Sequence, residues 1–161
     1  MAFVAAFLMG LIVTMTGCRQ KTEFKEFSFN YTVESTASYQ LSVAFDSDRN
    51  FRIERHNFLM DNHNRRHAPQ IKQGTLTDEE YARLKKAVEE SQLFTMEDSY
   101  GFEEESNYPV MYQISLTADG REKFVSIRHH AEARYPQSFI ELIDQINVLV
   151  KDHRNDPNVE E

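Results

Sequence analysis

Cysteine and glycine are scarce in this sequence, and basic residues are fewer than acidic ones. Each of these shortages argues against a class of protein. The single cysteine, Cys18, cannot form an internal disulfide, so the fold must depend on a hydrophobic core. Five glycines in 161 residues leave little material for loops that cradle phosphates. The net charge of −8 argues against nucleic-acid binding, which places Lys and Arg against phosphates.

Charge is also absent from residues 1–17, and residues 2–16 are apolar apart from two threonines. A run of this length is typical of a signal peptide and is shorter than the ~20 residues that a membrane-spanning helix needs. It ends in Met15-Thr16-Gly17-Cys18, which resembles the lipobox of bacterial lipoproteins. The resemblance implies that residues 1–17 are a lipoprotein signal peptide, removed before Cys18. Lipid would then be attached to that cysteine.

Two alternatives for this segment are a short membrane anchor and a buried N-terminal helix. Under the lipoprotein interpretation, Arg19 follows the cysteine where lipoproteins retained in the inner membrane commonly carry Asp. The expected location is therefore the cell envelope, with the lipid in the outer membrane if the organism is diderm. The expected partners are the membrane itself, through lipid on Cys18, and another envelope protein.

The composition then changes twice along the chain. Residues 18–26 combine Cys18 with polar and charged residues, and they predict a lipidated tether. The segment 27–152 has the length of one ordinary domain. Residues 153–161 are polar and predict a disordered tail.

Apolar and polar residues alternate in five stretches, the pattern of half-buried strands: 27–33, 39–45, 51–53, 110–116 and 124–129. Pairing Phe45 with Phe51 sets Val43 opposite Ile53 on one face. Asp119-Gly120 suits a two-residue type I′ turn, which sets Ile114 opposite Val125. A further short strand is expected at 70–76.

Two helices are expected. Thr77 and Glu80 form a capping box that starts a helix of about four turns. An apolar stripe from Phe139 to Val150 marks a second helix, with Pro136 in its first turn. The order of elements predicts an α+β domain: a largely antiparallel sheet of five to six strands, with both helices packed on one face.

The run from Gly74 to Tyr81, followed by Leu84, Phe94 and Asp98-Ser99-Tyr100, is similar to an uncharacterised domain family of bacterial lipoproteins of unknown function. The resemblance covers about residues 27–150. It implies a fold and an envelope location, and no activity. Members often carry Cys-Pro before the second strand, where this chain has residues 36–39, Thr-Ala-Ser-Tyr. A role that depends on that cysteine is therefore absent.

Histidines offer two candidate metal sites. His63 and His67, with His56 upstream, would share a face only on a helix, and Arg65 and Arg66 beside them would repel a cation. We therefore favour solvated loop histidines. His129 and His130 end the second hairpin, where His129 is expected to face inward and His130 outward. Neighbouring strand residues on opposite faces cannot easily chelate one ion.

An acidic cluster is the third candidate. Glu97 and Asp98 precede Glu103-Glu104-Glu105, and their oxygens could hold calcium or a basic partner. Their spacing does not match an EF-hand loop, so a solvated loop is the favoured interpretation.

No sequence motif for a nucleophile, a phosphate loop or a Cys–His pair is present, and the chain is predicted not to be an enzyme, with no cofactor and no metal. The leading hypothesis is a non-catalytic domain that binds another envelope protein through a sheet edge or the aromatic N-terminal strand. The alternative is a small-ligand or metal-ion module that uses residues 56–67 or 97–105. An enzyme with converging carboxylates is the third hypothesis.

Overall fold

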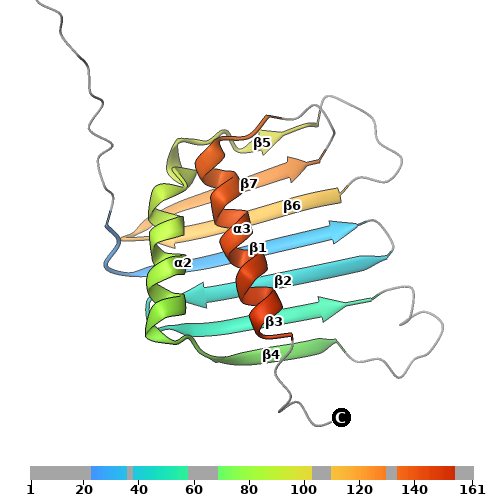
Figure 1. The fold of residues 1–161 in the computed structure, drawn as a ribbon. Coiled ribbons are helices and arrows are strands. Elements are labelled where there is room, and N and C mark those ends of the chain that lie inside the picture. The colour runs from blue at the N-terminus through green and yellow to red at the C-terminus, as the bar shows by residue number, and fades with distance from the viewer. Residues whose placement is uncertain (1–22, 36–37, 58–68, 103–109, 130–133, 155–161) are drawn as a thin grey trace, which may run out of the picture.

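Seven strands form one sheet, and two helices lie side by side across one of its faces (Figure 1). The computed structural model describes residues 23–35, 38–57, 69–102, 110–129 and 134–154. Its elements in chain order are β1 (Phe27–Ser35), β2 (Tyr39–Asp46), β3 (Asn50–His56), β4 (Gln70–Thr75), α2 (Asp78–Glu90), the short 3₁₀ helix η1 (Leu93–Thr95), β5 (Ser99–Tyr100), β6 (Val110–Ala118), β7 (Arg121–Arg128) and α3 (Gln137–Asp152).

The predicted class is confirmed: an α+β domain with a mostly antiparallel sheet and both helices on one face. The strand count of five to six was too low, because β5 is a strand of two residues and leaves no periodic pattern in the sequence. The strand order is β4-β3-β2-β1-β6-β7-β5, and the β5–β7 pair is parallel. β1 therefore lies in the middle of the sheet, between two hairpins.

The predicted strand registers are confirmed. Val43 pairs with Ile53, and Ile114 pairs with Val125. The turn between β6 and β7 has positive φ at both positions, 48° at Asp119 and 76° at Gly120. The predicted type I′ turn requires positive φ at both positions, a conformation that Asp and Gly tolerate.

The helix-facing side of the sheet forms the core. Phe27, Phe29 and Tyr31 of β1 are at most 4% exposed, beneath the two helices. Leu84 of α2 and Leu142 of α3 are fully buried against the same layer. The aromatic N-terminal strand was one predicted partner contact, and that prediction was wrong because these rings fill the core.

Both helix starts agree closely with the sequence. Thr77 caps α2 through the predicted capping box: its side chain accepts from the Glu80 N–H, and the Glu80 carboxylate accepts from the Thr77 N–H at 2.8 Å. Pro136, predicted to lie in the first turn, stands instead at the N-cap of α3, one residue before the helix begins at Gln137. Within the described ranges, no helix is long and apolar enough to span a membrane.

The folded domain extends beyond the predicted boundaries at both ends. Phe24 is 4% exposed, and its N–H donates to the Glu89 carboxylate at 2.9 Å. The N–H groups of Lys25 and Glu26 both donate to Asp119 Oδ1 at 3.1 Å. His153, assigned from sequence to the tail, packs with its ring centre 4.4 Å from that of Phe51. Cys18 and residues 1–17 lie outside the described residues.

Candidate functional site: the open sheet face at β3 and β4

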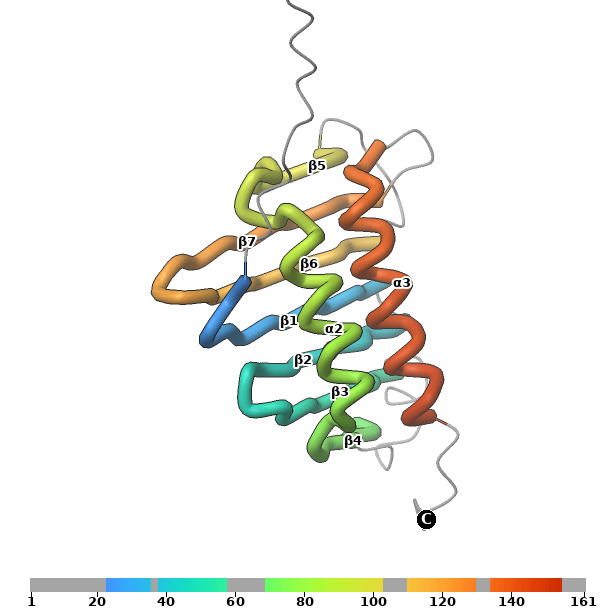
Figure 2. Tube along the Cα trace, turned by 60° about the vertical axis from the view of Figure 1, so that its left-hand side comes forward, coloured from blue at the N-terminus to red at the C-terminus, as the bar shows by residue number. Residues whose placement is uncertain are grey.

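Both helices lie on one face of the sheet, and no described helix or strand lies over the other face (Figures 1 and 2). We call it the open face. The strand registers align its side chains in rows that cross the sheet. Over the centre of this face, the three strands β2, β1 and β6 present small or neutral polar side chains: Asn30, Thr32, Ser42, Ala44, Gln113 and Ser115.

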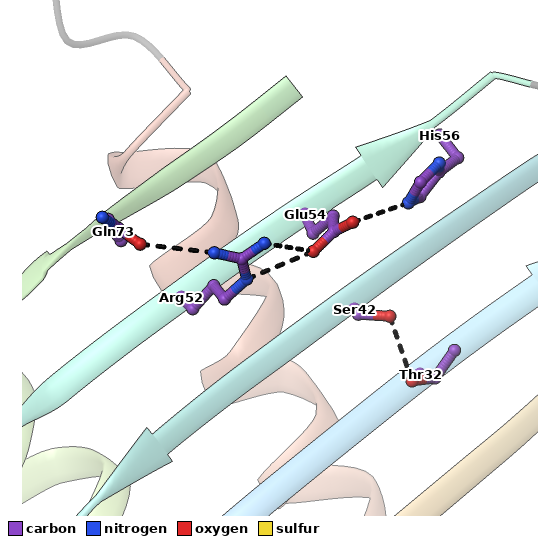
Figure 3. Close-up of polar contacts among 6 residues, drawn as sticks. All are labelled: Thr32, Ser42, Arg52, Glu54, His56 and Gln73. Carbon is purple, nitrogen blue, oxygen red and sulfur yellow. Dashed lines mark hydrogen bonds and ion pairs between the residues drawn. The ribbon is translucent and has the colours of Figure 1, made fainter. Parts of the chain in front are cut away.

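A charged ladder begins where this neutral area meets β3. Residues 52, 54 and 56 alternate onto the open face because successive strand side chains point to opposite sides. Arg52 Nη2 donates to Glu54 Oε2 at 2.8 Å, and His56 Nε2 lies 2.9 Å from Glu54 Oε1 (Figure 3). Arg52 Nη1 also donates to Gln73 Oε1 of β4 at 3.3 Å, so the ladder crosses to the next strand.

The hydrogen bonds from Arg52, and then from His56, hold the pKa of Glu54 below its ordinary value. Glu54 is therefore ionised at neutral pH. With both carboxylate oxygens engaged, it holds the guanidinium and the imidazole in place along the strand. This arrangement presents a fixed pattern of hydrogen-bond donors to whatever meets the open face.

A pair of hydroxyls lies next to the ladder. Thr32 and Ser42 are 3.1 Å apart across β1 and β2, and Ser42 stands opposite Glu54 in the β2–β3 register (Figure 3). The described contact of the Ser42 hydroxyl is with Thr32, and none of the described contacts connects it with His56. The two hydroxyls extend the polar surface from the ladder onto β2 and β1.

A shallow hollow of about 440 Å³ adjoins the ladder, toward the end of the sheet where β1 begins. Its polar rim comes from Asp46, Asn50, Arg52, Gln73 and Thr75. Asp46 Oδ1 accepts the N–H groups of Asp48 and Asn50 at 2.9 and 3.0 Å, so this carboxylate mainly holds the β2–β3 turn. The hollow combines charges of both signs and is wide open, which suits a polar side chain from a protein surface.

β4 borders the hollow and is the outermost strand of the sheet on this side. Ile71 is 48% exposed, although it is a large apolar side chain. It stands opposite Glu54 in the β3–β4 register, beside the middle of the charged ladder. We call Arg52, Glu54, His56, Ile71 and Gln73 together the β3–β4 corner.

The structure describes two of the five candidate histidines, His56 and His129. His56 belongs to the β3–β4 corner, whereas His63, His67 and His130 lie outside the described residues. His129 was expected to face inward. It is exposed at the end of β7, although its ring meets that of Tyr112 edge to face, with ring centres 6.0 Å apart.

The acidic cluster is only partly described. Asp98 forms an ion pair with Lys123, and the Glu97 N–H donates to the Tyr100 hydroxyl at 3.0 Å. Residues 103–105 lie outside the described residues. Among the residues that the structure describes, no three His, Cys, Asp or Glu side chains are grouped so as to hold a metal ion.

Sequence reasoning missed Arg52, Glu54 and Gln73. A signal existed in the segment 50–56, where every second residue is polar and the odd positions are apolar at Phe51 and Ile53. That pattern places the even positions on the solvent side of β3. The link to Gln73 leaves no such signal, because it depends on which strand pairs with β3.

The chain matches no protein-family model, and a search among curated proteins found no significant similarity. The likeness of residues 74–100 to a lipoprotein domain therefore remains a prediction.

Proposed function

We propose that this chain is a bacterial lipoprotein, held on a membrane of the cell envelope by lipid on Cys18. We further propose that its folded domain is non-catalytic and binds another envelope protein at the β3–β4 corner. The observation that supports this most is the combination at that corner: an exposed Ile71 beside an ordered polar ladder, on the sheet face that no described helix covers.

The proposed anchor rests on the apolar run that ends at Cys18. Its consequence for the domain follows from the burial of Phe24. An extended chain advances at most ~3.6 Å per residue, so six residues from Cys18 to Phe24 reach about 20 Å. Lipid on Cys18 would hold the Phe24 end of the domain within that distance of the bilayer.

The proposed binding surface rests on its composition. Protein interfaces are depleted of charge at their centre and enriched in apolar and Arg side chains that can be buried. The open face has a neutral centre, and Ile71 and Arg52 stand at its β3–β4 side. An arginine already held by a carboxylate loses little conformational freedom when a partner covers it.

Replacement of Cys18 tests the anchor. In a bacterium that expresses the full chain, the wild type should incorporate labelled palmitate and sediment with membranes, because two or three acyl chains anchor stably. The Cys18→Ser variant should lose the label and remain unprocessed at the signal peptide. A Cys18→Ser variant that is still cleaved and membrane-bound without label would overturn the lipoprotein proposal.

Arg19→Asp is the matched control, since it alters the neighbouring residue and leaves the sulfur in place. This variant should retain the palmitate label. In a diderm host it should move from the outer-membrane fraction to the inner-membrane fraction.

Site-specific photo-crosslinking tests the partner. A photo-crosslinking amino acid in place of Ile71 should give one reproducible protein adduct in intact cells. The control position is Asn147, which is exposed on α3 in the helix layer, and it should not give that adduct. Absence of a reproducible adduct at Ile71, or an equal yield from both positions, would contradict the proposed binding surface.

A further inference from the structure

We infer that β4 is a docking edge: an extended segment of the partner adds to the sheet as an eighth strand along Ile71, Gln73 and Thr75. This inference rests on the proposed function and deepens it, since it names the kind of partner and the atoms that recognise it. The partner is a β-strand-forming segment of another protein, bound through its main chain.

The hydrogen-bonding pattern of β4 identifies the free groups. The Leu76 N–H donates to the Arg49 carbonyl at 2.8 Å, just beyond the Thr75–Asn50 pair. In an antiparallel pair, the residues that bond to the neighbouring strand alternate with residues that point away from it. Counting back from Leu76, the main-chain groups of Gln70, Lys72 and Gly74 bond to β3.

Ile71, Gln73 and Thr75 consequently direct their N–H and C=O groups outward. β4 is the last strand of the described sheet on this side, so its outward groups have no strand partner among the described residues. An added strand would find three donors and three acceptors spaced at two-residue intervals. Recognition of this kind requires an extended backbone and is largely independent of side-chain identity.

The two edges of the sheet differ in a way that favours β4. Sheet edges are commonly protected by being very short or by carrying proline or charge. β5, at the opposite edge, has only two residues. β4 has six residues and no proline, and its one charged residue, Lys72, pairs in register with Ile53 of the helix-facing side. β4 is therefore the longer template for another strand.

Side chains on both faces of β4 indicate what the added strand carries. On the open face, Ile71 is half exposed and Gln73 is held by Arg52, so a partner residue opposite Ile71 is expected to be apolar or β-branched. On the helix side, Gly74 provides no side chain, and a Cβ built there would lie 3.1 Å from Phe51 Cε1. A large apolar or aromatic partner side chain can cover such an edge glycine.

A second copy of this chain fits the edge less well. Two β4 strands paired antiparallel are related by a two-fold axis perpendicular to the sheet, which turns one copy end for end. The two Phe24 ends would then lie at opposite ends of the joined sheet. Since each proposed anchor reaches only about 20 Å from Phe24, a shared membrane disfavours this arrangement.

Proline substitution tests the main-chain contact directly. Gln73→Pro removes an outward N–H and leaves the bonds to β3 in place, a position where edge strands tolerate proline. Combined with the photo-crosslinking amino acid at Ile71 in the full chain, Gln73→Pro should reduce the adduct yield about tenfold, because hydrogen bonds to the partner are lost. Gln73→Ala loses the same side chain but keeps the N–H, so it should give a severalfold higher adduct yield than Gln73→Pro.

Amide exchange on the purified full chain in detergent provides a second, partner-free measurement. The amides of Ile71, Gln73 and Thr75 should exchange faster than those of Gln70, Lys72 and Gly74, in strict alternation. Protection of all six amides in the monomer would mean that the chain covers its own edge, and the inference would be overturned. The same measurement on the Gln73→Pro variant shows whether the ladder with β3 is intact.

The outcomes separate this inference from the proposed function. An adduct that persists undiminished in Gln73→Pro would leave a protein partner but eliminate strand addition. An adduct of twice the chain's mass would identify a second copy and contradict the inferred partner. Absence of any adduct at Ile71 would eliminate both the proposed binding surface and strand addition at β4. Failure of the Cys18 test alone would leave the alternating exchange pattern and the effect of Gln73→Pro on the adduct unchanged.

Discussion

The backbone N–H of Phe24 donates to the carboxylate of Glu89, 65 residues later in the chain. Glu89 lies near the end of α2 and is also the ion-pair partner of Lys85. This contact fastens the segment before β1 to the helix layer, and the Phe24 ring packs edge to face against Phe94, with ring centres 6.0 Å apart. The folded domain therefore starts only a few residues after Cys18.

Phe24→Ala is expected to lower the free energy of unfolding by about 3 kcal/mol, because it removes a buried ring from a core that cannot fully collapse. Urea unfolding followed by circular dichroism measures the change. Phe124→Ala is the matched control: Phe124 is 52% exposed, and its loss should cost less than about 0.5 kcal/mol. A loss for Phe24→Ala as small as that expected for Phe124→Ala would show that Phe24 does not contribute to the folded core.

Glu80 couples the start of α2 to the end of α3. Partial burial by itself raises the pKa of Glu80, but hydrogen bonds from Thr77 and from His153 outweigh it and hold the pKa below its ordinary value. A depressed pKa in the folded state means that ionised Glu80 stabilises the fold above its unfolded pKa of ~4.3. This stabilisation is lost as the pH falls through the lower folded value.

The Glu80→Gln variant should therefore be less stable than the wild type by about 1 kcal/mol at pH 7, and the difference should shrink as the pH falls below the unfolded pKa of ~4.3. Urea midpoints measured from pH 7 down to pH 3 test this pattern. A difference between the two proteins that stays constant with pH would show that the charge of Glu80 contributes nothing.

Asp119 has two functions in one turn. Its φ of 48° suits Asp or Asn, and its carboxylate accepts the N–H groups of Lys25 and Glu26. Asp119→Ala should cost about 1–2 kcal/mol, since it loses both hydrogen bonds and strains the turn. Asp119→Asn keeps an acceptor oxygen and the tolerated φ, and thermal unfolding should place it much closer to the wild type than Asp119→Ala.

Gly74→Ala should destabilise the domain by about 1 kcal/mol, because the new methyl group would press on the Phe51 ring. The centre of the Phe51 ring lies 4.4 Å from the centre of the His153 ring. If the contact with His153 keeps the Phe51 ring from moving aside, the His153→Ala background should relieve part of the strain. A double-mutant cycle in urea measures the coupling. Strictly additive changes in stability would mean that the contact with His153 does not restrain the Phe51 ring beside Gly74.

Local patterns determined much of this protein by themselves. Alternation and turn chemistry set the strand registers at Val43–Ile53 and Ile114–Val125, because a hairpin is closed by residues near in sequence. The capping box at Thr77 likewise depends on residues three apart. The apolar run that ends at Cys18 is also visible without a fold, and it supports the proposed anchor.

Tertiary structure decided the rest, because it joins residues that no local pattern relates. The β1–β6 pairing placed the aromatic strand in the core. The β3–β4 pairing brought Gln73 to Arg52 and placed Ile71 on the outermost of the described strands. Hydrogen bonds from the Phe24 N–H to Glu89 and from the Lys25 N–H to Asp119 hold this segment against the domain, although the residues around Phe24 are polar. Periodicity shows which face of a strand is buried, but long-range pairing alone determines which strand remains at the edge.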